Sequence, residues 1–294
     1  MRRFQYFAPQ SLQEAIDLLR QRDGGGRPLA GGTDLVAQMK EGTLKAGPFP
    51  SYAVSLRRIP DLKGIDFSEK EGLRIGSGVT MAELIRSPIV RERFRIIADG
   101  AGLVGSLQTM NMATVGGNLC NAAPSADTAP PLLACEAQAL IVGPTGQRSL
   151  PLEEFFLAPS RTVLAPDELL VELRVPALPP RTGGVYVRHT PRKRMDIAVV
   201  GVGVLLTLSE DDRIERARIA LGAVAPTPMR ARRAEAILEG NEASDELFKQ
   251  AAEAAAAEAR PISDQRGSAE FRRHLVRVMT ERCLREAAAR ARAG

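Results

Sequence analysis

The chain has 294 residues, of which 44% are hydrophobic and 26% charged, and its formal net charge is +5. This length predicts about two domains with a full-sized core, and the composition excludes wholesale disorder, collagen-like repeats and a coiled-coil rod. The absence of Trp and an aromatic content of only 4% disfavour a single-strand nucleic-acid binder, since such proteins stack bases on aromatic rings. The small basic surplus suits a nucleic acid or a polyanionic ligand equally well.

Cysteine usage and the N-terminus bear on the compartment. Cys120, Cys135 and Cys283 form no C-x-x-C pair, so neither a disulfide framework nor a zinc or iron–sulfur site is supported. The chain opens without the apolar stretch of a signal peptide, and its longest apolar run, residues 197–208, is too short to span a bilayer. We expect a cytoplasmic protein in a reducing compartment, with no transmembrane segment and no nucleic-acid partner.

The first 176 residues predict short strands and helices separated by glycine turns. A capping box at residues 11–14 begins the first helix and another at residues 80–83 begins a later one. A long polar loop is expected at residues 106–121. The expected helices are 11–21, 35–40, 89–104 and 128–135, and the expected strands are 27–30, 53–56, 73–76, 139–142 and 168–175.

A proline cluster at residues 176–180 marks the expected domain boundary. Three β-rich segments follow it, at residues 185–189, 198–208 and 217–221, and residues 210–213 suit a hairpin turn between the last two. From residue 230 the pattern is helical, with an Ala-rich segment at 250–260 and an amphipathic one at 271–292. Strands followed by helices predict an α+β second domain with a three-stranded antiparallel sheet.

Several catalytic motifs are missing. The sequence has no G-x-S-x-G, Walker A or H-E-x-x-H pattern, and His189 and His274, its only histidines, fall in different predicted elements. Gly76-Ser-Gly78 resembles half of a dinucleotide fingerprint, but Met81 stands where a third glycine is needed, so a tight turn is favoured. Hydrolase triads, histidine metal sites and a nicotinamide site are therefore disfavoured.

Two glycine pairs predict a binding site. In residues 29–35, Gly31 and Gly32 follow a strand and precede a helix, which suits a phosphate. In residues 114–127, Gly116 and Gly117 are flanked by hydroxyl and amide side chains, and a carboxylate, Asp127, follows. Each segment alone is compatible with an ordinary loop, and Asn118 and Asn121 could equally cap loop backbone. Together, the two pairs favour one ligand with two linked phosphates, approached from both sides by backbone.

At these segments the sequence resembles the FAD-binding medium subunit of the molybdenum hydroxylases, the family of carbon monoxide dehydrogenase and xanthine dehydrogenase. Residues 29–35 are similar to the first family loop, and residues 114–118 with 121–127 are similar to the second. Three further segments, at residues 194–198, 221–228 and 261–268, resemble the family's C-terminal domain. The resemblance thus covers nearly the whole chain.

The resemblance implies a fold and a set of binding residues. The fold is a two-subdomain FAD module of the vanillyl-alcohol-oxidase type at residues 1–176, divided at about residue 58, followed by an α+β domain at 177–294. Asp127 would bind the sugar or ribityl part of FAD, and Arg188 stands where relatives often carry Lys, a replacement that keeps the charge but changes its shape. Its structural alternative is a strand residue that faces solvent. The implied cofactor-binding residues are Leu29, Ala30, Gly31, Gly32, Thr33, Asp34, Leu35, Val104, Thr114, Gly116, Gly117, Asn118, Asn121, Asp127, Leu170 and Arg188.

The resemblance also implies partners and a role. A large subunit would carry the molybdenum cofactor, a small subunit would carry [2Fe-2S] clusters, and FAD in this chain would pass their electrons to an external acceptor, in a dimer of heterotrimers. Three scattered cysteines do not provide the four ligands of an additional cluster. A stand-alone flavin oxidoreductase and a non-catalytic assembly protein remain alternatives. The arginines of the last helix, Arg272, Arg273, Arg277 and Arg285, suit a solvated face better than a partner contact.

Overall fold

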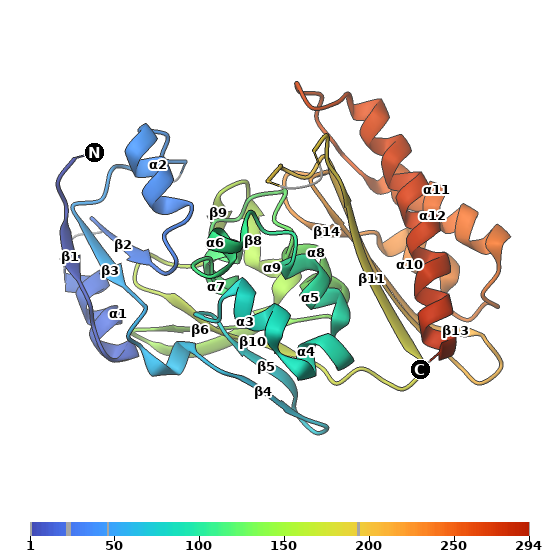
Figure 1. Ribbon diagram of the computed structural model, residues 1–294, viewed down its shortest axis with the longest axis horizontal. Helices are drawn as coiled ribbons and strands as arrows, with labels where there is room; N and C mark the ends of the chain where they lie inside the picture. The colour runs from blue at the N-terminus through green and yellow to red at the C-terminus, as the bar shows by residue number, and fades with distance from the viewer. Residues whose placement is uncertain (1, 22–24, 46, 193–194, 294) are drawn as a thin grey trace.

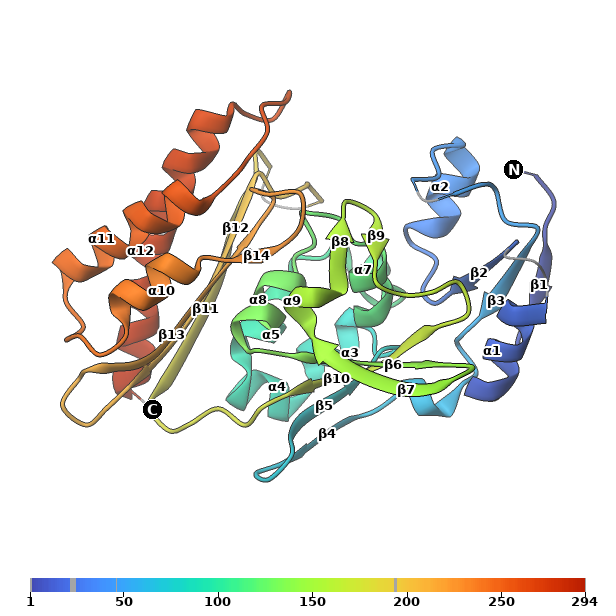
Figure 2. The same ribbon diagram turned by 180° about the vertical axis from the view of Figure 1, so that it is seen from behind.

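The computed structural model describes residues 2–21, 25–45, 47–192 and 195–293. Three units, each built on its own β-sheet, follow one another along the molecule, with the N-terminal unit at one end and the C-terminal helices at the other (Figures 1 and 2). Within these residues, no helix is both long enough and apolar enough to cross a membrane.

The N-terminal unit is a three-stranded parallel sheet with two helices. Strand β3 (Tyr52–Ser55) lies between β1 (Gln5–Phe7) and β2 (Gly26–Leu29) and is parallel to both. Helix α1 (Leu12–Gln21) packs its apolar face on the sheet, and α2 (Leu35–Glu41) follows β2. The predicted helices and strands of this region are confirmed. The Ser11 hydroxyl accepts from the Glu14 amide as expected, whereas the Glu14 carboxylate accepts from the amide of Gln10, one residue before the predicted cap.

The middle unit is built on a five-stranded antiparallel sheet. Strand β10, the last of the five along the chain, is inserted between β5 and β6. The sheet is therefore complete only when residues 169–175 are in place. A single 3₁₀ turn, Pro60–Leu62, connects it to the N-terminal unit. In spatial order the strands are β4 (Ile65–Ser68), β5 (Gly72–Gly76), β10 (Leu169–Val175), β6 (Gln138–Gly143) and β7 (Gly146–Pro151).

Short helices and a two-stranded hairpin complete this unit. The predicted helix at 89–104 is wrong as a single element, because it breaks at Phe94, whose buried ring meets that of Phe67 with centroids 5.8 Å apart. The predicted loop at 106–121 is also wrong. It contains two helices, too short to show periodicity in sequence, that begin at the hydroxyls of Ser106 and Thr114. The elements are α3 (Met81–Arg86), α4 (Pro88–Arg93), α5 (Arg95–Ala101), α6 (Leu107–Met110), α7 (Val115–Cys120), α8 (Ala129–Ala134), α9 (Leu152–Phe155), β8 (Phe156–Ala158) and β9 (Arg161–Thr162).

The C-terminal unit has a four-stranded antiparallel sheet, so the prediction of three strands is wrong. The fourth strand has only two residues and follows Pro226 and Pro228. A strand this short shows no alternation of apolar and polar residues that the sequence could reveal. The predicted hairpin turn at 210–213 is confirmed. The strands are β11 (Thr182–His189), β12 (Val200–Leu208), β13 (Ile214–Gly222) and β14 (Met229–Arg230), and the helices are α10 (Arg232–Leu238), α11 (Asp245–Glu258) and α12 (Ala269–Ala293).

This sheet is covered on both faces. Helices α10 to α12 lie on its outer face, while α5 and α8 of the middle unit lie against the other (Figure 2). Glycines allow close approach on each side: a Cβ on Gly183 would lie 2.0 Å from the Ala287 carbonyl oxygen of α12, and one on Gly222 would lie 2.9 Å from Pro130 of α8. Burial on both faces explains why every residue of β12 is buried.

The arginines of α12 do not all form a solvated face. Arg272 is only 3% exposed, and it donates hydrogen bonds to the carbonyls of Val199 and Ala223 and to the carboxylate of Asp264. The expectation for this residue is wrong because helical periodicity does not show which loops fold back onto a helix start. Arg273 is exposed, as expected.

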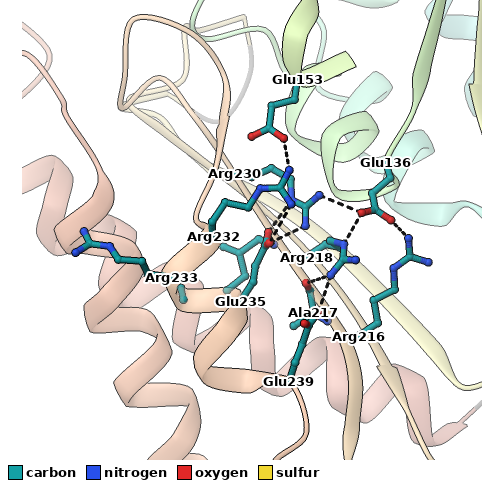
Figure 3. A network of polar contacts seen from close by, with 12 residues as sticks. Glu136, Glu153, Arg216, Ala217, Arg218, Arg230, Arg232, Arg233, Glu235 and Glu239 are labelled. Carbon is teal, nitrogen blue, oxygen red and sulfur yellow. Dashed lines mark hydrogen bonds and ion pairs between the residues drawn. The ribbon is translucent and has the colours of Figure 1, made fainter. Parts of the chain in front are cut away.

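A cluster of arginines and glutamates joins the middle and C-terminal units (Figure 3). Glu136, at the end of α8, pairs with three arginines of the C-terminal sheet: Arg216, Arg218 at 2.7 Å and Arg230 at 3.2 Å. Arg230 is 3% exposed and also binds Glu235 through two hydrogen bonds. Because these arginines lose their water when the units pack together, the carboxylates that replace it hold the interface together.

We predict that Glu136→Gln lowers the free energy of unfolding by about 2 kcal/mol, because it removes charge-assisted bonds to three partly buried arginines. Chemical denaturation of the whole chain measures this change. The matched control is Glu69→Gln, whose partner Arg93 lies in an exposed pair and whose loss should cost less than about 1 kcal/mol. Equal effects of the two substitutions would contradict a special role for Glu136.

Candidate functional site

The first glycine loop offers unpaired backbone donors. It runs from the end of β2 into α2, and Gly32 takes a φ of +75°, which favours glycine. No amide of residues 31–35 donates a hydrogen bond to any residue that the structure describes, and Asp34, at the start of α2, makes no side-chain cap. Consecutive amides without a protein partner are typical of a site that receives an anion.

The second glycine loop is held internally instead. The Val115 and Gly116 amides donate to the carbonyls of Val79 and Ser77, and the Gly117 amide donates to the Thr114 hydroxyl at 3.1 Å. A Cβ on Gly116 would lie 2.5 Å from that of Ser77, so glycine is required for this close packing. The second loop is therefore a rigid wall whose first amides are already bonded.

The fold brings the two loops together although they belong to different sheets. A Cβ on Gly31 would lie 1.9 Å from the Met112 carbonyl oxygen, and one on Gly117 would lie 3.7 Å from the Cβ of Ala30. The Gln38 side chain donates to Asn121 at 3.4 Å, linking α2 to the end of α7. The predicted pairing of the glycine segments at one place is thus what the structure shows.

A cavity of about 170 Å³ lies between these loops. Ala30 and Gly31 line it on one side and Thr114 on the other. Glu83 lines it too, and Arg57 and Lys63, which also line it, leave a surplus of positive charge that suits an anionic ligand. The sequence analysis missed these two residues, which belong to no motif. A larger surface groove of about 470 Å³, over Asp66 and Arg74, is lined by none of the predicted binding residues.

Asp127 lies at the boundary with the C-terminal unit. Its carboxylate is 7% exposed, accepts a hydrogen bond from the Tyr186 hydroxyl at 2.9 Å and forms an ion pair with Arg188. Burial raises the pKa of Asp127 to about 6, although Arg188 and the Tyr186 hydroxyl favour its charged form. The Arg188 side chain is only 5% exposed, so the alternative of a solvent-facing strand residue is wrong.

The remaining predicted residues lie in several environments. Leu29, Thr33 and Leu35 belong to the first loop, where all three are half-buried. Asn118 accepts a 2.6 Å hydrogen bond from the Thr128 hydroxyl, so its amide group has a structural partner. The side chains of Val104, after α5, and Leu170, in β10, pack in the core of the middle unit. Burial raises the pKa of the Cys120 thiol to about 12, which makes it an unreactive neutral side chain.

Comparison with known protein families identifies the family of this chain. Residues 2–178 match the family described as the FAD binding domain in molybdopterin dehydrogenase. The chain belongs to this family. Residues 185–287 match the CO dehydrogenase flavoprotein C-terminal domain. The chain is therefore the FAD-binding flavoprotein subunit of an oxidoreductase.

Individual relatives extend over the whole chain. The carbon monoxide dehydrogenase medium chain of Hydrogenophaga pseudoflava is 36% identical over 98% of both sequences. The putative xanthine dehydrogenase FAD-binding subunit of Escherichia coli is 32% identical over 97% of this chain and 96% of its own. A solved carbon monoxide dehydrogenase from H. pseudoflava superposes with a TM-score of 0.93, at 37% identity and over 98% of both chains. Quinoline 2-oxidoreductase from Pseudomonas putida 86 gives a TM-score of 0.90 at 30% identity, over 99% of this chain and 98% of its own.

The raised pKa of Asp127 predicts a pH-dependent stability. Between the ordinary value of 3.8 and about 6, the folded chain holds a proton on Asp127 that the unfolded chain has released. The contribution of this group to stability is therefore largest below this interval and is lost as the pH rises through it. Asp127→Asn abolishes the titration.

Chemical denaturation of the wild type and Asp127→Asn from pH 4 to 7 tests this. The free energy of unfolding of the wild type, minus that of the variant, should fall by about 2–4 kcal/mol over the range. A difference that is constant, or that rises with pH, would contradict the raised pKa.

Proposed function

We propose that this chain is the FAD-binding electron-transfer subunit of a molybdenum-containing hydroxylase or dehydrogenase, accepting electrons from [2Fe-2S] clusters of a partner and passing them to an external acceptor. The observation that carries the proposal is the meeting of the two glycine segments: the amides of residues 31–35, which donate to no described residue, lie beside a preformed wall and a cavity lined by Gly31 and Thr114. FAD supplies the redox chemistry when it is bound. The protein contributes position and charge.

The pyrophosphate of FAD would lie at this cavity. The amides of residues 31–35 would donate to its oxygens, and Gly31 and Gly117 allow the two segments to approach each other closely beside it. Arg57 and Lys63 would balance its charge. Thr114, Gly116, Gly117 and Asn118 would form the opposite wall, and Asn121, Asp127 and Arg188 would lie toward the sugar and ribityl part. Val104 and Leu170 would not touch the cofactor directly. They would help to build the apolar layer beneath it.

The domain limits and the partners are part of the same proposal. We place the FAD-binding domain at residues 1–176, with subdomains divided near residue 58, and the C-terminal domain at 177–294. These limits agree with the change of sheet in the structure. Relatives are named medium chains or FAD-binding subunits, which supports a large molybdopterin subunit and a small [2Fe-2S] subunit as partners, in a dimer of heterotrimers. A cytoplasmic location fits this assembly.

The test is to identify the flavin in the purified full-length chain after reconstitution with FAD. Heat release and chromatography should give stoichiometric FAD, and the double variant Gly32→Val, Gly117→Val should bind it at least roughly tenfold more weakly. Valine at Gly32 strains a left-handed backbone, and valine at Gly117 fills the space between the loops.

The matched control is Gly240→Val. Gly240 also has a positive φ, +80°, but lies in the C-terminal unit with nothing within 4 Å of its Cβ position. This variant should keep its FAD. Preference for FMN, or no flavin in the wild type even when partner subunits are present, would contradict the pyrophosphate site and favour an assembly protein. Turnover of a small substrate by the chain alone would favour a stand-alone oxidoreductase.

A further inference from the structure

Tyr186 connects the C-terminal sheet to the proposed flavin site. Successive side chains of β11 point to opposite faces, so Tyr186 and Arg188 share the face that lies against the middle unit. Gly184, on the same face, has its Cβ position 3.2 Å from Ile96 of α5. From this face Tyr186 and Arg188 both reach Asp127. The carboxylate is thus fixed by two groups that the FAD-binding domain does not itself contain.

The neighbouring strand is shaped to admit the tyrosine. A Cβ on Gly201 of β12 would lie 2.7 Å from the Tyr186 hydroxyl oxygen. Any larger residue at position 201 would displace the hydroxyl from Asp127. Tyr186 is 5% exposed, so its hydroxyl needs a partner, and among the described residues Asp127 provides it.

The contacts continue from Asp127 to the second glycine loop. Thr128, the next residue, is 1% exposed, and its hydroxyl donates to the Asn118 side chain at 2.6 Å. Asn118 lies in α7, one residue after Gly117. Two hydrogen bonds, joined by the peptide bond between residues 127 and 128, therefore connect the C-terminal sheet to the segment that forms the wall of the cavity.

We infer that Tyr186 is a positioning residue of the flavin site, which acts through Asp127 and Thr128 to hold the second glycine loop in place. The inference rests on the proposed function. A carboxylate oxygen accepts more than one hydrogen bond, so Asp127 keeps acceptor capacity for a cofactor hydroxyl while Tyr186 and Arg188 fix its orientation. The C-terminal domain is then a part of the binding site as well as a neighbour of it.

The test measures the FAD affinity of the full-length wild type and of the Tyr186→Phe variant. Binding is followed by the change in flavin fluorescence, at a series of pH values between 5 and 8. Tyr186→Phe should weaken FAD binding roughly fivefold to tenfold at pH 7.5. Its pH profile should also move upward, because the ionised carboxylate loses a donor. Among the described residues, Tyr186 and Arg188 are the ionisable groups that interact with Asp127, and Asp127→Asn should flatten the profile.

The matched control is Tyr52→Phe, which also removes a buried tyrosine hydroxyl, one that donates to the Leu18 carbonyl at 3.0 Å in the N-terminal unit. It should leave the FAD affinity and the pH profile at wild-type values. If Tyr186→Phe behaves as Tyr52→Phe does while the wild type binds FAD, the inference is overturned and the proposed function stands. If the wild type binds no FAD, the proposed function itself fails.

A second variant keeps the inference testable if Tyr186→Phe does not fold. Thr128→Val removes the hydroxyl that reaches Asn118 and leaves Tyr186 and Asp127 in place. It should weaken FAD binding by a factor similar to that of Tyr186→Phe. Thr207→Val is its control, because Thr207 is a buried threonine whose hydroxyl pairs with Thr182 at 2.8 Å, inside the C-terminal sheet. Equal FAD affinities of the two valine variants would overturn the connection to Asn118.

Discussion

The close approach of Gly31 to the Met112 carbonyl is the constraint on which the site depends. The two glycine loops belong to a parallel sheet and to an antiparallel sheet, and they become one cavity only because no side chain separates them at this point. Gly116 has the same role against Ser77 inside the middle unit. These glycines are therefore needed for packing, and the proposed binding site is a consequence of how the first two units meet.

The third unit contributes buried charge at the next interface. Asp127 with Arg188, and Glu136 with Arg230, each place a carboxylate of the middle unit against an arginine of the C-terminal sheet. Such pairs add little net stability compared with apolar packing. Removing one partner is costly, however, because it leaves the other charge buried and unpaired. These pairs therefore specify one arrangement of the two units.

Sequence patterns predicted the parts of this arrangement that are local. Glycine pairs and capping boxes report on turns and helix starts: the turn at Gly31 and Gly32 and the cap at Thr80 were found where expected, whereas Gly116 and Gly117 lie in α7. The break at Phe94, the two-residue β14 and the burial of Arg272 depend on contacts between distant segments, which no short window contains. The same holds for Tyr186: nothing in its neighbourhood along the chain shows that Asp127, 59 residues away, accepts its hydroxyl. Family resemblance indicated Asp127 and Arg188 but did not explain what holds them.

The two loops differ in a way that the glycine pairs did not reveal. Amides of the second loop are bonded to Val79, Ser77 and Thr114, whereas those of residues 31–35 have no partner within the described chain. A loop whose amides are already satisfied keeps its shape without a ligand, and a loop whose amides are open gains bonds when an anion arrives. The second loop is thus the preorganised half of the site. The C-terminal sheet, through Tyr186 and Thr128, supports this half, so the domain farthest from the first loop stabilises the wall against which that loop binds its ligand.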